Sequence, residues 1–161
     1  MHPPLPPLYT NDASPEFLRN LDESTFTEAE VAGFAEESRE AYRKNEAYIA
    51  AHPAIGIHRP ATEGSQSREG GVITQASSAL SFSLDDGREL RIARKGDRVT
   101  YPDGRTAHIV TGAGEANSDL ALVGSRLSNG DEIINTLHAG FVMVVRDGVP
   151  KAADFLPPVD A

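Results

Sequence analysis

The chain has 161 residues, a formal net charge of −9, and neither cysteine nor tryptophan. This length suits one domain with a modest core, or a small domain with an appendage. The negative charge disfavours nucleic acids and anionic membranes as partners, and the lack of cysteine excludes disulfides, thiolate catalysis and cysteine-bound zinc.

The N-terminal lead, residues 1–12, is rich in proline and lacks the basic segment of a signal peptide. No apolar run approaches the roughly 18 residues that cross a bilayer, so stable membrane insertion is not expected. These features predict synthesis in the cytoplasm, with any export independent of a signal peptide.

Two helices are predicted after this lead. Ser14 and Pro15 are typical of a helix start, and we expect a short helix that ends near Leu21. Residues 25–30 hold two overlapping capping boxes, which predict one long helix running to about Ala51. Its apolar stripe is narrow, which favours packing on a small body or on a partner.

The composition changes near residue 55. Residues 1–57 hold ten acidic against four basic side chains, whereas twelve of the fourteen glycines lie in residues 64–148. We therefore expect three parts: a proline-rich lead with an acidic helical extension over 1–57, a β body over 58–148, and an extended proline-rich tail over 149–161.

Short strands separated by turn residues are predicted from Val72 onward. The strictly alternating run 80–84 is followed by the turn 85–87 and the run 90–93, which together predict a hairpin. Further short strands are expected at 99–101, 107–110, 121–123, 133–135 and 141–145. The sequence thus predicts a mainly β fold with an N-terminal α-helical extension.

The most informative stretch is 92–104, and residues 122–133 echo it. Both are short apolar runs that end in Gly-Asp or Gly-Ser and lead into another turn. Glycine at this spacing reverses the chain every few residues. This pattern favours a compact β structure over an enzyme built on long helices.

Two sets of residues could carry chemistry. His108 and His138 both lie in the β region, and with a carboxylate such as Glu69 or Asp103 they could bind zinc in a small metal-dependent enzyme. The alternative is that both are surface or turn histidines. Asp97 and Asp131 could likewise form a carboxylate pair, but an aspartate after glycine in a tight turn more often caps its own backbone.

Residues 64–135 resemble the PAAR (proline-alanine-alanine-arginine repeat) proteins, which form the tip of the type VI secretion spike. The family carries a glycine pair, then a segment A-R-x-G-D, then further strands that end in glycine. In this chain 93–97 match that segment, and 107–112 and 120–125 match the later strands. The positions that carry the motif and its turns are Gly70, Gly71, Ala93, Arg94, Gly96, Asp97, Gly124, Gly130 and Asp131.

The resemblance implies a small cone of short β-strands with a pseudo-threefold arrangement. Its base would cap the trimeric β-helical spike protein, and its point would lead through the target membrane. The helical extension would recruit an effector or an adaptor. Such a protein is a structural and binding component, not an enzyme; it is loaded in the cytoplasm and then secreted by the contractile apparatus. A generic β-rich binding module is the blander alternative.

Many family members hold a zinc ion near the point through histidines and a cysteine. This chain has no cysteine, and Glu69 stands before the glycine pair where the family often has histidine. His108 matches the family's histidine region, and His138 falls where a last ligand could come. A zinc ion would therefore need an altered set of ligands.

Overall fold

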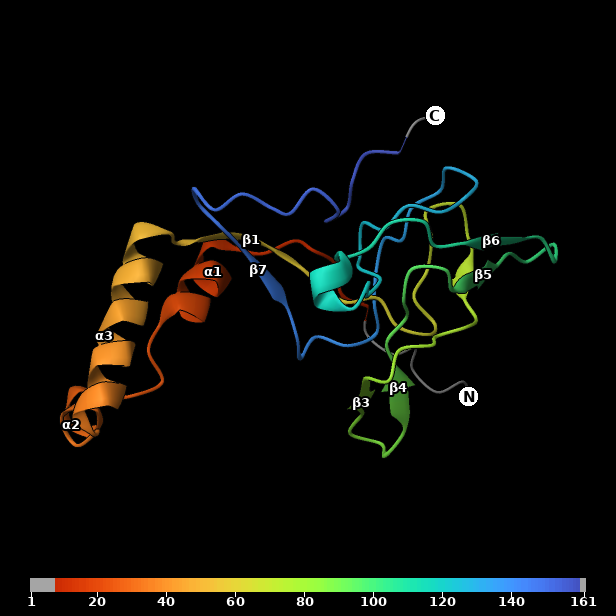
Figure 1. Cartoon of the computed structure of the whole chain (residues 1–161). Helices are drawn as coiled ribbons and strands as arrows, with labels where there is room; N and C mark the ends of the chain where they lie inside the picture. The colour runs from red at the N-terminus through yellow and green to blue at the C-terminus, as the bar shows by residue number, and fades with distance from the viewer. Residues whose placement is uncertain (1–7, 160–161) are drawn as a thin grey trace. The chain divides into compact units, whose positions relative to one another are not determined.

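The computed structural model describes residues 8–159 and divides them into two compact units (Figure 1). Residues 8–11, 58–143 and 151–159 form the first unit, which we call the repeat body. Residues 12–57 and 144–150 form the second, the helical unit. These bounds differ from the expected 1–57, 58–148 and 149–161 because each end of the described chain joins the repeat body, and residues 144–150 join the helical unit.

The helical unit begins with α1 (Pro15–Asp22), at the place where the sequence predicts it. The Ser14 side chain accepts a hydrogen bond from the Phe17 backbone N–H at 3.0 Å, so it satisfies one of the free donors of the first turn. The predicted end near Leu21 is also confirmed to within a residue.

The long helix predicted to reach Ala51 is two helices, α2 (Glu28–Ala32) and α3 (Glu36–Ala51). The capping box at the start of α2 is complete, but the helix ends at Gly33, and α3 restarts without a side-chain cap. Glycine is a poor helix former, and the break lets Phe34 pack edge-on against Phe26 with ring centroids 5.1 Å apart. Our prediction of a single helix was wrong for this reason.

A two-stranded sheet completes the helical unit. Strand β1 (Ala54–His58) pairs with β7 (Met143–Arg146), which comes from the far end of the chain. The Asp22 carboxylate joins this sheet to α1, because it accepts from the Ala54 backbone at 2.8 Å and pairs with Arg146 at 2.9 Å. A half-buried ion pair therefore fixes β7 next to the first helix.

The repeat body contains two further small sheets. One is antiparallel with the order β2 (Val72–Ile73), β5 (Arg98–Thr100), β6 (Thr106–His108), and the other is the predicted hairpin of β3 (Ser81–Ser83) and β4 (Glu89–Arg91). A single 3-10 turn, η1, spans Glu115–Asn117. The predicted strands 121–123 and 133–135 form only isolated bridges. With three α-helices and seven short strands in the described residues, the chain is a small mixed α/β protein.

Three segments of the body share one pattern of backbone hydrogen bonds: residues 61–74, 93–110 and 121–134, which we call the first, second and third repeats. In the first repeat, Gly64 donates to the Ile73 carbonyl and Ile73 donates to the Ser65 carbonyl, each at 2.9 Å. The same two bonds recur between Gly96, Ile109 and Asp97, and between Gly124, Ile133 and Ser125.

The repeats are joined by a closed ring of hydrogen bonds between three alanines. The N–H of Ala61 donates to Ala121 at 2.8 Å, that of Ala121 to Ala93 at 2.9 Å, and that of Ala93 back to Ala61 at 2.9 Å. All three residues are fully buried. A second ring links the repeats in the opposite cyclic sense, from Thr74 to Arg98, from Val110 to Arg126, and from Ile134 to Gln66. The body therefore has pseudo-threefold symmetry in its backbone.

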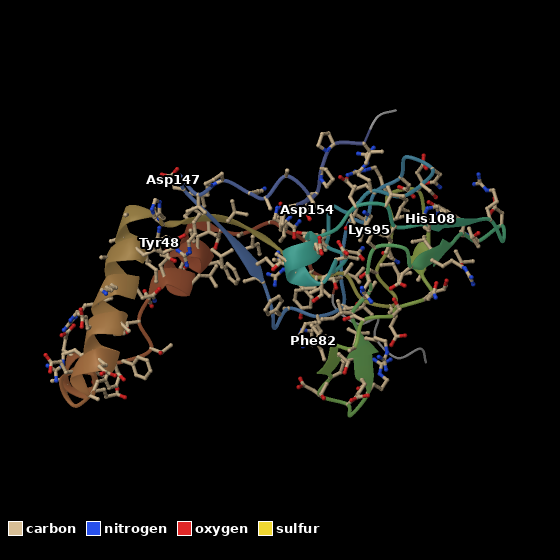
Figure 2. All side chains as sticks on the ribbon, viewed as in Figure 1. Tyr48, Phe82, Lys95, His108, Asp147 and Asp154 are labelled. Atoms are coloured by element: carbon tan, nitrogen blue, oxygen red, sulfur yellow. The ribbon has the colours of Figure 1, made fainter. Side chains whose placement is uncertain are left out.

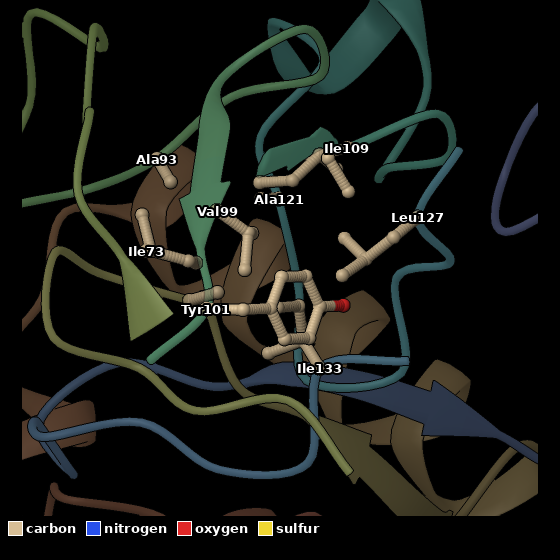
Figure 3. Packing of buried hydrophobic residues seen from close by; sticks show 10 residues of the cluster. Ile73, Ala93, Val99, Tyr101, Ile109, Ala121, Leu127 and Ile133 are labelled. Atoms are coloured by element: carbon tan, nitrogen blue, oxygen red, sulfur yellow. The ribbon is translucent and has the colours of Figure 1, made fainter. Parts of the chain in front are cut away.

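One apolar core serves all three repeats. Figure 3 shows side chains from each of them converging on the same volume. The cluster consists of Ala61, Ile73, Ala93, Val99, Tyr101, Ala107, Ile109, Ala121, Leu127 and Ile133. Since each repeat contributes only a few of these side chains, none of them has a core of its own.

Candidate functional site

The A-R-x-G-D segment forms a turn that is capped by its own aspartate. Asp97 is only 3% exposed, and its Oδ2 accepts from the Arg94 backbone N–H at 2.7 Å. The carboxylate also accepts from the backbone N–H and the hydroxyl of Ser77, at 2.9 and 2.6 Å. The Arg94 side chain is exposed and reaches the Ser118 carbonyl at 3.3 Å. The Asp97 carboxylate therefore holds the backbone of this turn in place.

Serine performs the same capping in the other two repeats. The Ser65 hydroxyl accepts from the Thr62 backbone N–H, and the Ser125 hydroxyl accepts from Leu122, each at 2.9 Å. Gly124-Ser125 is therefore the structural counterpart of Gly96-Asp97. The sequence echo at Gly130-Asp131 belongs to a different turn of the repeat.

Asp131 binds the turns of all three repeats together. Its Oδ2 accepts from the Tyr101 hydroxyl at 2.5 Å, and its Oδ1 accepts from the backbone N–H of Glu132 at 2.7 Å and of Glu69 at 3.2 Å. Asn129 donates to the same hydroxyl at 2.9 Å. Glu69, Tyr101 and Asp131 belong to the first, second and third repeats. One carboxylate thus cross-links three turns, one from each repeat.

This network shifts the titration of both of its acids. Burial raises the pKa of Asp131, but hydrogen bonds from Ser67, Tyr101 and two backbone N–H groups outweigh it, so the pKa is lowered overall. Burial raises the pKa of Tyr101, and the neighbouring carboxylate adds to the effect. The pair therefore favours a charged aspartate and a neutral tyrosine.

The glycine pair has two separate structural reasons. Gly70 has a φ of +94°, a conformation that side chains other than glycine rarely adopt. Gly71 has ordinary backbone, but a Cβ there would lie 2.6 Å from Val99 Cγ1 and 2.8 Å from Ser67 Oγ. The turn and the tight approach of the second repeat thus both require glycine.

The two candidate zinc ligands lie in different places. His108 is exposed at the end of β6, where its backbone N–H donates to Ser128 Oγ at 3.1 Å. The His138 ring is stacked on Phe82 with centroids 3.7 Å apart, and it accepts from the Gly140 N–H at 2.9 Å. Figure 2 shows Phe82, and with it the stacked ring, well separated from His108.

The proposed zinc set is therefore not assembled. Across residues 8–159, no three His, Asp or Glu side chains gather in a way that could hold a metal ion. Of the two carboxylates considered, Asp103 pairs with Arg105 at 2.6 Å, and Glu69 contributes its backbone N–H to Asp131. The described residues do not fit the zinc site that the resemblance to PAAR proteins implies.

Sequence reasoning missed the first repeat and Tyr101. The signal was available: an alanine followed three positions later by Gly-Ser or Gly-Asp occurs at Ala61, Ala93 and Ala121. The second repeat has 18 residues where the other two have 14, because β5 and β6 are joined by the turn at Pro102–Arg105. That insertion hides the period. Tyr101 carried no local signal, since its partner lies in another repeat.

Comparisons with known proteins identify no relative. A scan of family models and searches of the curated proteins and of the solved structures found no match to this chain. In the part of the chain that the structure describes, no helix has the length and hydrophobicity to cross a bilayer.

Proposed function

We propose that this protein is a spike-tip protein of the type VI secretion system, which caps a trimeric β-helical spike. The observation that supports this function is the closed ring of Ala61, Ala93 and Ala121, which gives a single chain three equivalent repeats about one axis. A partner of three identical subunits can then present one subunit to each repeat, whereas an asymmetric body would match only one of them.

The cross-linked turns suit a mechanical task. A tip that sharpens the spike for membrane puncture must resist bending, and side-chain cross-links between repeats oppose the sliding of one repeat past another. The Asp131 carboxylate provides such a link through Tyr101 and Glu69.

The helical unit is an addition to this repeat body. In the proposed function the helical unit recruits an effector or an adaptor, which recognises it by its acidic side chains. The chain is loaded onto the spike in the cytoplasm and leaves with it through the contractile apparatus. The protein acts as a structural and binding component, so the A-R-x-G-D segment serves the turn and not a reaction.

The test is the stoichiometry of a complex. The full-length chain is co-expressed with the spike trimer of the organism that encodes it, and the purified assembly is weighed by native mass spectrometry. We expect one copy of this chain for each trimer. Three copies for each trimer, or no complex, would contradict the proposal, because a threefold body on a shared axis leaves room for one.

A further inference from the structure

Helix α3 has an apolar face that the helical unit covers only in part. It is 16 residues long, yet none of its residues is buried. An isolated helix of this length is marginal in water, and most helical stability in proteins comes from packing of an amphipathic face. Tyr42 and Ile49, two turns apart, are the half-buried apolar residues on this face. A partner that covered them would supply the missing contacts.

A groove runs along this face of α3. It has a volume of about 440 Å³ and lies between α3 and residues 21–26. Its apolar lining comes from Leu21, Phe26, Tyr42, Ile49 and Ala50. Phe26 is 46% exposed, so a large aromatic surface faces solvent within the groove.

The walls of the groove are held in place without a ligand. The rings of Phe26 and Tyr42 pack edge to face with centroids 6.2 Å apart. The Tyr42 hydroxyl also hydrogen-bonds Ser24 Oγ, which ties α3 to the opposite wall. A preformed groove binds without first paying the cost of ordering its walls.

The rim of the groove is acidic. Asp22, Glu23 and Glu46 line it, and residues 12–57 as a whole carry ten acidic against four basic side chains. Asp22 and Glu46 are paired with Arg146 and Arg43, so Glu23 and the net charge of the unit set the local field. This field attracts a cationic partner and repels an anionic one.

We infer that this groove binds an amphipathic helix of a cargo or adaptor protein whose polar face carries lysine and arginine. The inference rests on the proposed function for the existence of cargo, and it adds the chemistry of the segment that docks. A helix alongside α3 packs its apolar ridge against Tyr42 and Ile49 while its basic side chains face Glu23.

The probe is a fluorescent peptide as long as α3, with leucine at positions i, i+3, i+4 and i+7 and lysine or arginine elsewhere. Anisotropy measures its binding to the full-length chain. Two control peptides separate the effect of the amphipathic pattern from the effect of positive charge. One has the same residues in scrambled order, and the other has glutamate in place of each basic residue. We expect the basic amphipathic peptide to bind at least about tenfold more tightly than either control.

Matched variants locate the binding surface. Ile49→Asn should weaken binding about tenfold, whereas Ala47→Asn, on the exposed side of the same helix, should leave it unchanged. Glu23→Gln should weaken binding about two- to fivefold at low salt, and Glu37→Gln should not. Equal binding of the scrambled peptide, no binding of any peptide, or insensitivity to Ile49→Asn overturns the inference.

The result is distinguishable from a failure of the proposed function. Ile49→Asn should still form the one-to-three complex with the spike trimer. If the wild-type chain forms the complex with the spike trimer but does not bind the peptide, the docking inference alone is wrong. If the peptide binds the groove and no complex forms, the spike-tip function is wrong and the groove remains.

Discussion

The Tyr101 hydroxyl donates to Asp131 at 2.5 Å, and this contact joins the second repeat to the third. Tyr101 is only 5% exposed, so water cannot readily replace its hydroxyl as the hydrogen-bond donor to Asp131. We predict that Tyr101→Phe lowers the free energy of unfolding by about 1.5–3 kcal/mol, the usual range for a hydrogen bond to a charged group. Urea titration followed by circular dichroism measures it. Tyr48→Phe, on the exposed face of α3, is the matched control and should change little.

The same pair predicts a pH window for stability. The pKa of Asp131 is lowered from 3.8 in the folded state. Asp131 therefore makes its full contribution to the free energy of unfolding above about pH 3.8, and this contribution falls as the pH drops through the folded-state pKa. Because the pKa of Tyr101 is raised from 10.0, its contribution is full below pH 10 and is lost as the pH rises through the folded-state pKa.

The measurement is the difference in unfolding free energy between the wild type and each variant across pH. The difference in unfolding free energy between the wild type and Asp131→Asn should become smaller below pH 4. The difference between the wild type and Tyr101→Phe should become smaller above pH 10. A gap that stays constant at both ends would show that the two groups titrate as they do in the unfolded chain.

Gly71 should tolerate no side chain. A Cβ would lie 2.6 Å from Val99 Cγ1, inside the core, so Gly71→Ala should cost about 1–3 kcal/mol through overpacking. Gly33→Ala is the control, since a Cβ there meets nothing closer than 3.5 Å and the backbone has a φ of −83°. We expect it to be neutral or to stabilise the chain by up to about 1 kcal/mol. Thermal melting of both variants checks the contrast.

The counterparts of Asp97 suggest a graded substitution. Asp97→Ala removes the acceptor for Arg94 and Ser77 and should cost about 1–3 kcal/mol. Asp97→Ser restores the capping group that Ser65 and Ser125 provide in the other repeats, so it should recover part of that loss. Equal destabilisation by the two substitutions would mean that the bonds to Ser77, and not the cap, carry the effect.

The zinc content of the purified protein tests whether His108 and His138 bind a metal ion. Since His108 and His138 do not share a site, we expect the purified protein to hold well under one zinc ion per chain. His108→Ala should leave both the zinc content and the melting temperature unchanged, because the ring is exposed at the end of β6. Stoichiometric zinc that is lost in His108→Ala would show that a ligand set forms outside the contacts described for residues 8–159.

Local features of the fold could be predicted from the sequence, because neighbouring residues determine them. The Ser14 cap and the hairpin turn at 85–87 are examples, since each depends on hydrogen bonds within a few residues. Of the two overlapping capping boxes in residues 25–30, the one formed by Thr27 and Glu30 marks the start of α2. The break at Gly33 was missed because the packing of Phe34 on Phe26 decided it, and ring packing has no local signature.

The candidate site depended on contacts that span the chain. The A-R-x-G-D segment predicted a capped turn, and its aspartate does cap one. The ring that joins Ala61 to Ala121 closes across 60 residues, and the link from Tyr101 to Asp131 spans 30. Proximity of His108 and His138 was inferred from their shared β region, but strand membership alone does not bring two side chains together.

The closed ring of alanines has a consequence for how the protein is made. Each of its three hydrogen bonds needs a donor from one repeat and an acceptor from another, and the ring closes only when all three are present. A nascent chain that has released the first two repeats from the ribosome still lacks the acceptor for Ala61. The ring can therefore close only after residue 121 has been synthesised, and a chain truncated before the third repeat lacks two of its three hydrogen bonds.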